Sequence, residues 1–257
     1  MPEFTSEEPA EKIEDATQPA AKGEISSPHK RKYRILLFQI VLFLAIGAFA
    51  MLTVMVKTTP SFPIDLHITR AIQSADSPFL SAIMNLISWP GFSPQSFIIP
   101  VLVVLLVYSF GFHWEAVVAS IAALFPSVFN VFVKDLIQRP RPSVNLVHVF
   151  RILDSYSFPS GHVMFYVGFF GFLWFLSFTL LKHSLMRTLL LVFLGSLIAL
   201  IGISRIYLGQ HWASDVLGAY LLGGLTLAII FQFYRWGKKR FFTQQPVAPH
   251  VPNKYEE

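Results

Sequence analysis

The sequence contains no cysteine and little charge. Without cysteine, the chain forms no disulfide and offers no thiolate for catalysis. Asp, Glu, Lys and Arg together make up only 14% of the 257 residues, whereas 54% are hydrophobic and 26 are phenylalanine. A water-soluble domain of this length cannot bury so much apolar surface. The composition therefore argues against an ordinary soluble protein and predicts a chain embedded in a membrane.

Long stretches without charge predict membrane-spanning helices. A helix needs about 20 mainly apolar residues to cross the hydrocarbon core of a bilayer. The predicted spans are 35–56, 96–113, 115–136, 160–181, 188–206 and 213–234. We therefore expect an all-α fold, a polytopic membrane bundle of six transmembrane helices. Between the first two spans, the segment 64–89 predicts either an amphipathic helix at the membrane surface or a structured loop packed on the bundle.

The parts outside the spans predict the domain organisation. Residues 1–28 are rich in Glu, Ala, Pro and Ser and have almost no large apolar residue, so we expect a disordered cytoplasmic tail. Residues 29–240 form the predicted six-span domain, and residues 241–257 form a C-terminal cytoplasmic tail.

Basic residues predict the orientation, because they favour the cytoplasmic side of a membrane. The basic clusters at 29–34, 182–187 and 235–240 all fall on one side of the predicted topology. Both termini are therefore expected in the cytoplasm of a plasma (inner) membrane, and the loops after the third and fifth spans face outward. Topology thus accounts for most of the net charge of +5, and no nucleic-acid partner is expected.

Five cations contradict this charge rule. Lys134, Arg139, Arg141, Arg151 and Arg205 lie on or beside the loops predicted to face outward. A cation at membrane depth requires a partner, and a phosphate group is a natural one. For Arg139 and Arg151, a role as anchor at the membrane interface is an equal alternative.

Three motifs contain the candidate site residues. They are Lys134-x6-Arg141-Pro142, Pro159-Ser160-Gly161-His162, and Ser204-Arg205-x5-His211-x3-Asp215. If a helix starts near His211, the Asp215 carboxylate can reach one nitrogen of the His211 ring. The other ring nitrogen is then left free as a nucleophile.

The second motif is typical of a helix start. Ser160 can cap the helix, although it is an alternative nucleophile, and Gly161 allows its backbone N–H to approach an anion. His162 lies in the first turn and can protonate a leaving oxygen as general acid. A zinc site at His211 and Asp215 is the alternative, but no third ligand has suitable spacing, so neither metal nor cofactor is expected.

These motifs resemble those of the type 2 phosphatidic acid phosphatase (PAP2) and vanadium haloperoxidase superfamily, in particular its membrane lipid phosphatases. The resemblance covers residues 134–215. It implies that His211 forms a phosphohistidine, later cleaved by water, that His162 is the acid and that Asp215 orients His211. The residues expected to bind phosphate are Lys134, Arg141, Ser160, Gly161 and Arg205.

The predicted function is that of an integral membrane, metal-independent phosphatase. Its expected partners are the bilayer and a lipid phosphate or diphosphate, such as undecaprenyl diphosphate, phosphatidic acid or phosphatidylglycerophosphate. Resemblance to small bacterial members favours undecaprenyl diphosphate. A lipid phosphotransferase using the same site is the main alternative. A vanadate haloperoxidase, whose known relatives are soluble, and a transporter, which needs no paired histidine motifs, are weaker ones.

Overall fold

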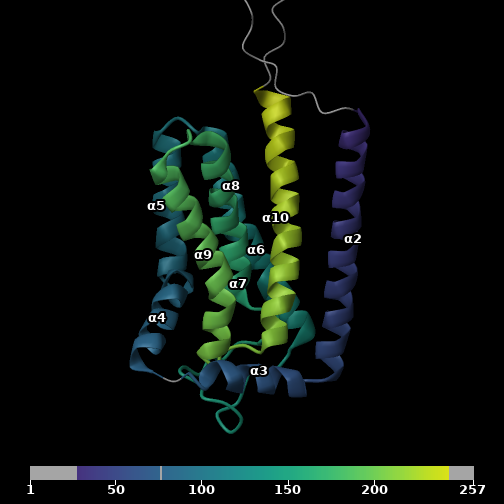
Figure 1. Cartoon of the computed structure of the whole chain (residues 1–257), viewed down its shortest axis with the longest axis vertical. Coiled ribbons are helices and arrows are strands. Elements are labelled where there is room, and N and C mark those ends of the chain that lie inside the picture. The colour runs from purple at the N-terminus through teal and green to yellow at the C-terminus, as the bar shows by residue number, and fades with distance from the viewer. Residues whose placement is uncertain (1–27, 76, 243–257) are drawn as a thin grey trace, which may run out of the picture. The chain divides into compact units, whose positions relative to one another are not determined.

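The structure is a computed structural model that describes residues 28–75 and 77–242, and this part of the chain contains helices and no strand. The all-α fold class is therefore confirmed. The predicted tails lie almost entirely outside the described residues. The elements are α2 (Pro28–Thr58), α3 (Pro63–Gln73), α4 (Pro78–Ser88), the 3-10 turn η2 (Trp89–Gly91), α5 (Gln95–Ser109), α6 (His113–Ile137), α7 (Gly161–Phe165), the π-helical turn η3 (Tyr166–Phe170), α8 (Gly171–Leu180), α9 (Leu185–Tyr207) and α10 (Ala213–Phe241) (Figure 1).

The chain divides into two units inside α2, between Phe43 and Leu44. The first unit includes the start of α2, whose residues from Ile35 onward are mainly apolar. The second unit contains the remaining helices and every residue of the predicted site.

Five helical stretches are long and apolar enough to cross a membrane, namely those at 32–58, 113–137, 161–180, 185–207 and 213–241. With 15 residues, α5 alone is too short, because it extends only about 22 Å against a hydrocarbon core of about 30 Å. Together with α4 and η2, from which it is bent by 60°, it forms a sixth candidate span. The prediction of six spans is thus met when this bent pair counts as one.

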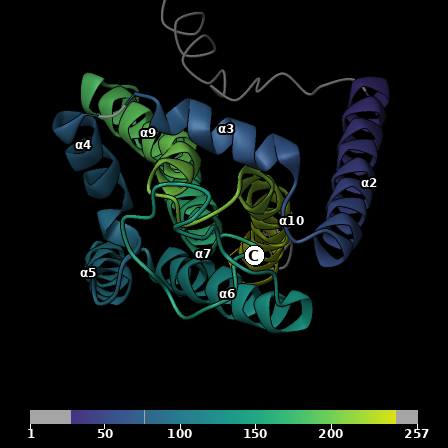
Figure 2. The ribbon, with the colours of Figure 1, turned by 90° about the horizontal axis from the view of Figure 1, so that it is seen from below.

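The stretch α7–η3–α8 lies at the centre of the second unit (Figure 2). It has the largest buried share of the five candidate spans, because its aromatic side chains pack against α6, α9 and α10. In contrast, many large apolar side chains of α5, α6 and α9 are exposed. This distribution is expected where lipid chains, rather than water, surround the helices.

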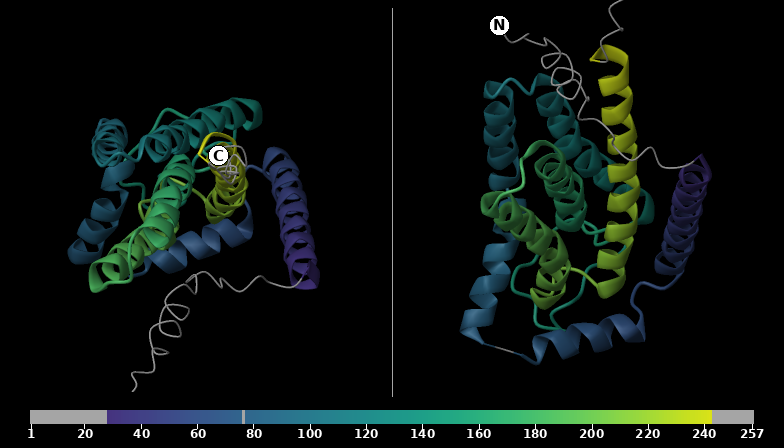
Figure 3. Two further views of the ribbon diagram at one scale, coloured as in Figure 1. Left: turned by 90° about the horizontal axis from the view of Figure 1, so that it is seen from above. Right: turned by 45° about the horizontal axis from the view of Figure 1, so that its top comes forward.

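The segment 64–89 is mostly helical, as the first predicted alternative had it, and packs on the bundle, as the second had it. α3 lies across the ends of α9 and α10, and α4 packs along α9. The Gln73 side chain donates to the backbone oxygens of His148 and Tyr207, at 2.7 and 2.8 Å. α3 and the loop 138–160 therefore lie together at the end of the unit where α10 begins (Figure 3).

Candidate active site

His211 lies in the loop immediately before α10. The helix begins at Ala213, and Asp215 in its first turn accepts a 2.8 Å hydrogen bond from the backbone N–H of Trp212. The same carboxylate oxygen, Oδ2, lies 3.5 Å from Nδ1 of His211. The expected pairing is present, but it is formed across the helix start rather than along a helical turn.

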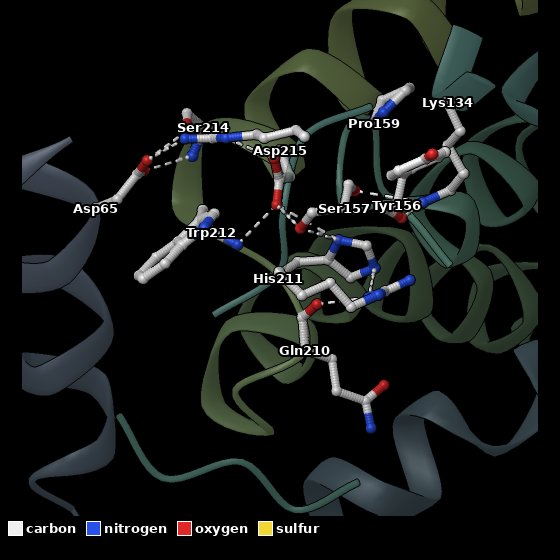
Figure 4. A network of polar contacts seen from close by, with 12 residues as sticks. Asp65, Lys134, Tyr156, Ser157, Pro159, Gln210, His211, Trp212, Ser214 and Asp215 are labelled. Atoms are coloured by element: carbon white, nitrogen blue, oxygen red, sulfur yellow. Dashed lines mark hydrogen bonds and ion pairs between the residues drawn. The ribbon is translucent and has the colours of Figure 1, made fainter. Parts of the chain in front are cut away.

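The neighbours of the His211 ring determine its tautomer. Arg141 Nη1 lies 3.2 Å from Nε2 of His211. Because a guanidinium only donates, Nε2 must be the acceptor, so the ring proton is on Nδ1. Nδ1 faces Asp215 and the hydroxyl of Ser157, which is also 3.5 Å away. The lone pair of Nε2 is therefore on the side of the ring that faces Arg141. Figure 4 shows the His211 ring beside Ser157 and Asp215.

Burial and positive charge keep the His211 ring neutral. Its exposed fraction is 2%, and burial, followed by the charges of Arg141, Lys134 and Arg205, holds the pKa of His211 well below its usual value of 6.5. Burial also lowers the pKa of Arg141, to about 10, which leaves this side chain protonated at neutral pH. The site thus places an uncharged imidazole beside a permanent cation.

Arg139 belongs to a buried network, so its alternative role as an interface anchor is wrong. Its guanidinium lies 2.5 Å from Oδ1 of Asp215 and 2.8 Å from Oδ2 of Asp65 on α3. Asp65 also accepts hydrogen bonds from the backbone N–H and the hydroxyl of Ser214, at 2.8 and 2.6 Å. Arg139 and Asp65 are each 1% exposed. Through Arg139, α3 fixes the orientation of the Asp215 carboxylate. Figure 4 shows Asp65 beside Ser214.

Sequence reasoning missed Asp65, Ser157 and Ser214, which lie outside the positions named by the motifs. Ser157 donates a 2.5 Å hydrogen bond to Oδ2 of Asp215. The only signal for Asp65 is that it is an acidic residue in a segment where apolar residues recur at helical spacing.

Lys134 and Arg205 differ in how fully their polar atoms are paired. The Lys134 ammonium donates to the backbone oxygens of Tyr156 and Ser157, and so holds the loop that contains Ser157. Arg205 is 0% exposed, and its Nη1 donates to the Ser88 hydroxyl at 3.1 Å. Nε and Nη2 of Arg205 have no hydrogen-bond partner among the described residues. Its guanidinium carbon lies 5.4 Å from the centre of the Phe92 ring.

His162 also packs on Phe92, with 4.9 Å between the ring centres. A Cβ atom at Gly91 would lie 2.4 Å from Cδ2 of His162, so only glycine allows this close approach. Nε2 of His162 is buried and has no partner in the described part of the chain. The absence of a side chain at residue 91 therefore leaves room for the ring of the predicted general acid.

Ser160 occupies the predicted N-cap position of α7, but its hydroxyl makes no capping hydrogen bond. The expectation that its side chain caps the helix is therefore wrong. Its Oγ is buried without a partner among the described residues. Next to it, a Cβ atom added at Gly161 would lie 3.0 Å from Oδ1 of Asn130, so the lack of a side chain at Gly161 leaves room for Asn130. Asn130 donates to the oxygen of Pro159 at 3.0 Å and so fixes this motif on α6.

Buried polar atoms without a partner are rare in folded proteins and often indicate a ligand. Among the described residues they occur on Ser160, His162 and Arg205, three of the predicted site residues, and also on Thr53, Arg187, Gln210 and Trp212. In the described part of the chain, no group of three or more His, Asp or Glu side chains is placed to hold a metal ion.

Comparison with known proteins assigns the family. The PAP2 superfamily model matches residues 113–239. Phosphatidylglycerophosphatase B of Bacillus subtilis (strain 168) is 31% identical over 183 residues, which cover 64% of this chain and 86% of that relative. The chain belongs to the PAP2 superfamily. The predicted family is thereby confirmed, whereas the expected likeness to undecaprenyl diphosphatases gains no support from these PAP2 relatives.

Two solved PAP2 structures share the fold. The crystal structure of a transmembrane PAP2 type phosphatidylglycerolphosphate phosphatase from Bacillus subtilis has a TM-score of 0.67 and 28% identity, covering 79% of this chain and 98% of that one. Aquifex aeolicus LpxE has a TM-score of 0.54 at 22% identity, covering 68% and 98%, and shows the fold alone. The transmembrane relative and the apolar helices together identify this PAP2 chain as an integral membrane protein.

Proposed function

We propose that this PAP2 protein hydrolyses a phosphate group of a membrane lipid, with Nε2 of His211 as the nucleophile. The observation that carries the proposal is a buried, neutral His211 whose Nε2 faces Arg141, while Nδ1 faces Asp215. The family relationship makes phosphate the group to be attacked.

The reaction proceeds in two steps. Nε2 of His211 attacks phosphorus, the bond between phosphorus and the lipid oxygen breaks, and His162 gives its proton to the departing oxygen. Asp215 and Ser157 stabilise the positive charge that develops on the His211 ring. Water then attacks the phosphohistidine, His162 takes the water proton, and cleavage of the P–N bond releases inorganic phosphate.

Cations take the place that metal ions hold in many phosphoryl transferases. Phosphoryl transfer depends mainly on neutralising charge on the oxygens around phosphorus. The free nitrogens of Arg205 and the permanent charge of Arg141 meet this need. Lys134 adds a third positive charge beside the loop that contains Ser157. The proposed reaction is accordingly independent of metal and cofactor.

An apolar cavity supports a lipid leaving group. It has a volume of about 450 Å³, lies between α5 and α6, and reaches Gly161 and His162. Its walls include Pro100, Val101, Val104, Leu105 and Leu124. A lipid chain in this cavity would have its ester oxygen beside His162, where the proposed general acid is needed.

The decisive experiment is phosphate release by the purified full-length protein in detergent, with chelator present. Phosphatidylglycerophosphate is the first substrate to test, because the Bacillus subtilis matches in sequence and in structure are named for its hydrolysis. Undecaprenyl diphosphate and phosphatidic acid follow. We expect release from at least one lipid and none from the His211→Ala variant. Activity that chelator abolishes and one divalent ion restores would refute the metal-independent reaction. Release of phosphate by His211→Ala would refute the assigned nucleophile.

We also propose that the site faces away from the cytoplasm of a plasma (inner) membrane. The basic residues of the α8–α9 turn and of the C-terminal part of α10 lie at the end of the unit opposite to the loop 138–160. Because the chain has no cysteine, Asn145→Cys gives a single label site at the exposed tip of that loop, and Lys239→Cys is the matched control. An impermeant thiol reagent should label only Asn145→Cys in intact cells. Labelling of only Lys239→Cys would show that the topology is the reverse of the one proposed.

A further inference from the structure

A smaller pocket, of about 250 Å³, adjoins the catalytic residues on the side of the loop 141–153. It lies outside the membrane-spanning helices and shares Arg141 with the proposed catalytic site. Apolar residues such as Pro142, Val149 and Leu153 form much of its wall, and its polar side chains include those of Arg141, Arg151 and Gln210. The described reaction uses neither Arg151 nor Gln210.

Gln210 is buried but has an unused amide. The residue is 2% exposed, and its Oε1 has no hydrogen-bond partner among the described residues. Its backbone oxygen accepts a 2.6 Å hydrogen bond from Arg141, while its side chain turns away from the His211 ring (Figure 4). Leaving a buried amide oxygen without a partner costs about 1–3 kcal/mol, a cost that a hydrogen-bond donor bound in the adjoining pocket would relieve.

Arg151 is a cation with no hydrogen bond or ion pair to any described residue. Its guanidinium carbon lies 5.8 Å from the centre of the Phe92 ring, and that of Arg205 lies 5.4 Å from the same centre. Phe92 therefore contacts one cation that is completely buried and one that is exposed in the loop 141–153. Because Arg151 is exposed and lines the pocket, we favour an anion-binding role for it over the role of an anchor at the membrane interface.

We propose that Arg151, Gln210 and Arg141 form a second phosphate site beside the catalytic one, an inference that rests on the proposed function. The two guanidinium groups supply positive charge and donors. The Gln210 amide can donate from its nitrogen to a phosphate oxygen and accept at Oε1 from a P–OH group. The occupant is a phosphate group, either inorganic phosphate leaving the catalytic site or the second phosphate of a lipid diphosphate.

The test compares Arg151→Gln and Gln210→Leu with the wild type and with Lys57→Gln, an exposed cation outside the pocket. One arm measures the inhibition constant of inorganic phosphate during hydrolysis of a lipid monophosphate. The other measures the ratio of kcat/KM for a lipid diphosphate to that for the monophosphate with the same chain. Loss of one charged donor should change the affected quantity by about 10-fold in Arg151→Gln, with a smaller change in Gln210→Leu. Lys57→Gln should change neither quantity.

The two arms identify the source of the phosphate group. A larger inhibition constant for phosphate with an unchanged kcat/KM ratio assigns the site to free phosphate. A lower kcat/KM ratio with an unchanged inhibition constant assigns the site to the lipid diphosphate. A third readout, stabilisation of the purified protein by inorganic phosphate against thermal unfolding, requires no turnover. If the wild type hydrolyses no lipid but Arg151→Gln reduces this stabilisation, the proposed function fails and the second site stands. No change in any of the three quantities would overturn the second site.

Discussion

Both ends of the helical unit contain buried charge, but the two ends pair it differently. At the end opposite the site, Glu115 of α6 is 2% exposed and contacts Lys238 Nζ at 2.6 Å and the Tyr234 hydroxyl at 3.0 Å. At the site end, Arg205 is completely buried and leaves two nitrogens without partners in the described chain. The first arrangement joins α6 to α10, whereas the second is the one expected of a group that binds a ligand.

The site end also contains a fully paired charge. Arg139 contacts both Asp65 and Asp215, so its charge is as well paired as that of Glu115, which contacts Lys238. Pairing therefore separates Arg139, whose charge is satisfied by two carboxylates, from Arg205, which, among the described residues, has two nitrogens left to donate. Under the proposed function, Arg139 and Asp65 position the site, whereas Arg205 and His162 would contact the substrate.

Substitution of one buried charge at each end should change activity at the site end and stability at the opposite end. Arg205→Met removes a poorly paired buried cation, so kcat/KM should fall about 10²–10³-fold while thermal stability in detergent stays level or rises. Lys238→Met leaves Glu115 without its cation, so the free energy of unfolding should fall by about 1–3 kcal/mol while kcat/KM remains near the wild-type value. If Arg205→Met lowered both stability and activity, Arg205 would belong with the structural ion pairs.

Arg139→Gln should reduce stability and activity together. Two buried carboxylates, those of Asp65 and Asp215, would lose their cation, at a cost of about 3–5 kcal/mol in the free energy of unfolding. The expected loss in kcat/KM is about 10–10²-fold, because Asp215 would remain but would be less well oriented. Thermal unfolding and lipid hydrolysis measured on the same preparation test this. If Arg139→Gln were destabilised but kept the wild-type kcat/KM, Arg139 would not be a positioning residue.

A smaller effect is expected on the pH dependence of kcat/KM when Arg141 is replaced. The pKa of His211 lies well below 6.5 because of burial and then the charge of Arg141, so the wild-type kcat/KM should decline on the acid side only below pH 6.5. Arg141→Gln removes a cation that disfavours protonated His211, so the pKa rises and the acid limb moves to higher pH. The shift is measured from pH profiles of kcat/KM for both proteins. It can be read even though the maximum kcat/KM of the variant is lower. An acid limb that stays in place or moves to lower pH would contradict the assigned electrostatics.

The sequence predicted most of the helix extents, because the length of an uncharged run determines whether it can cross a bilayer. It did not predict the bend between α4 and α5, since hydropathy contains no information on the angle between two apolar helices. Spacing along the chain indicated the pairing of His211 with Asp215. It gave only a weak signal for Asp65, an acidic residue in an apolar segment, and none for its contact with Ser214 across 149 positions. It gave no signal for Phe92, which contacts site residues from other helices. Motifs give the residues of a site, whereas long-range packing gives their supports.

A substrate with an acidic leaving group separates attack on phosphorus by His211 from protonation of the leaving group by His162. A nitrophenyl phosphate needs little protonation as it departs, so His162→Ala should hydrolyse it much better, relative to the wild type, than it hydrolyses a lipid phosphate. His211→Ala should remain inactive on both substrates, because no phosphohistidine can form. Equal rescue of the two variants by the nitrophenyl substrate would contradict these assignments.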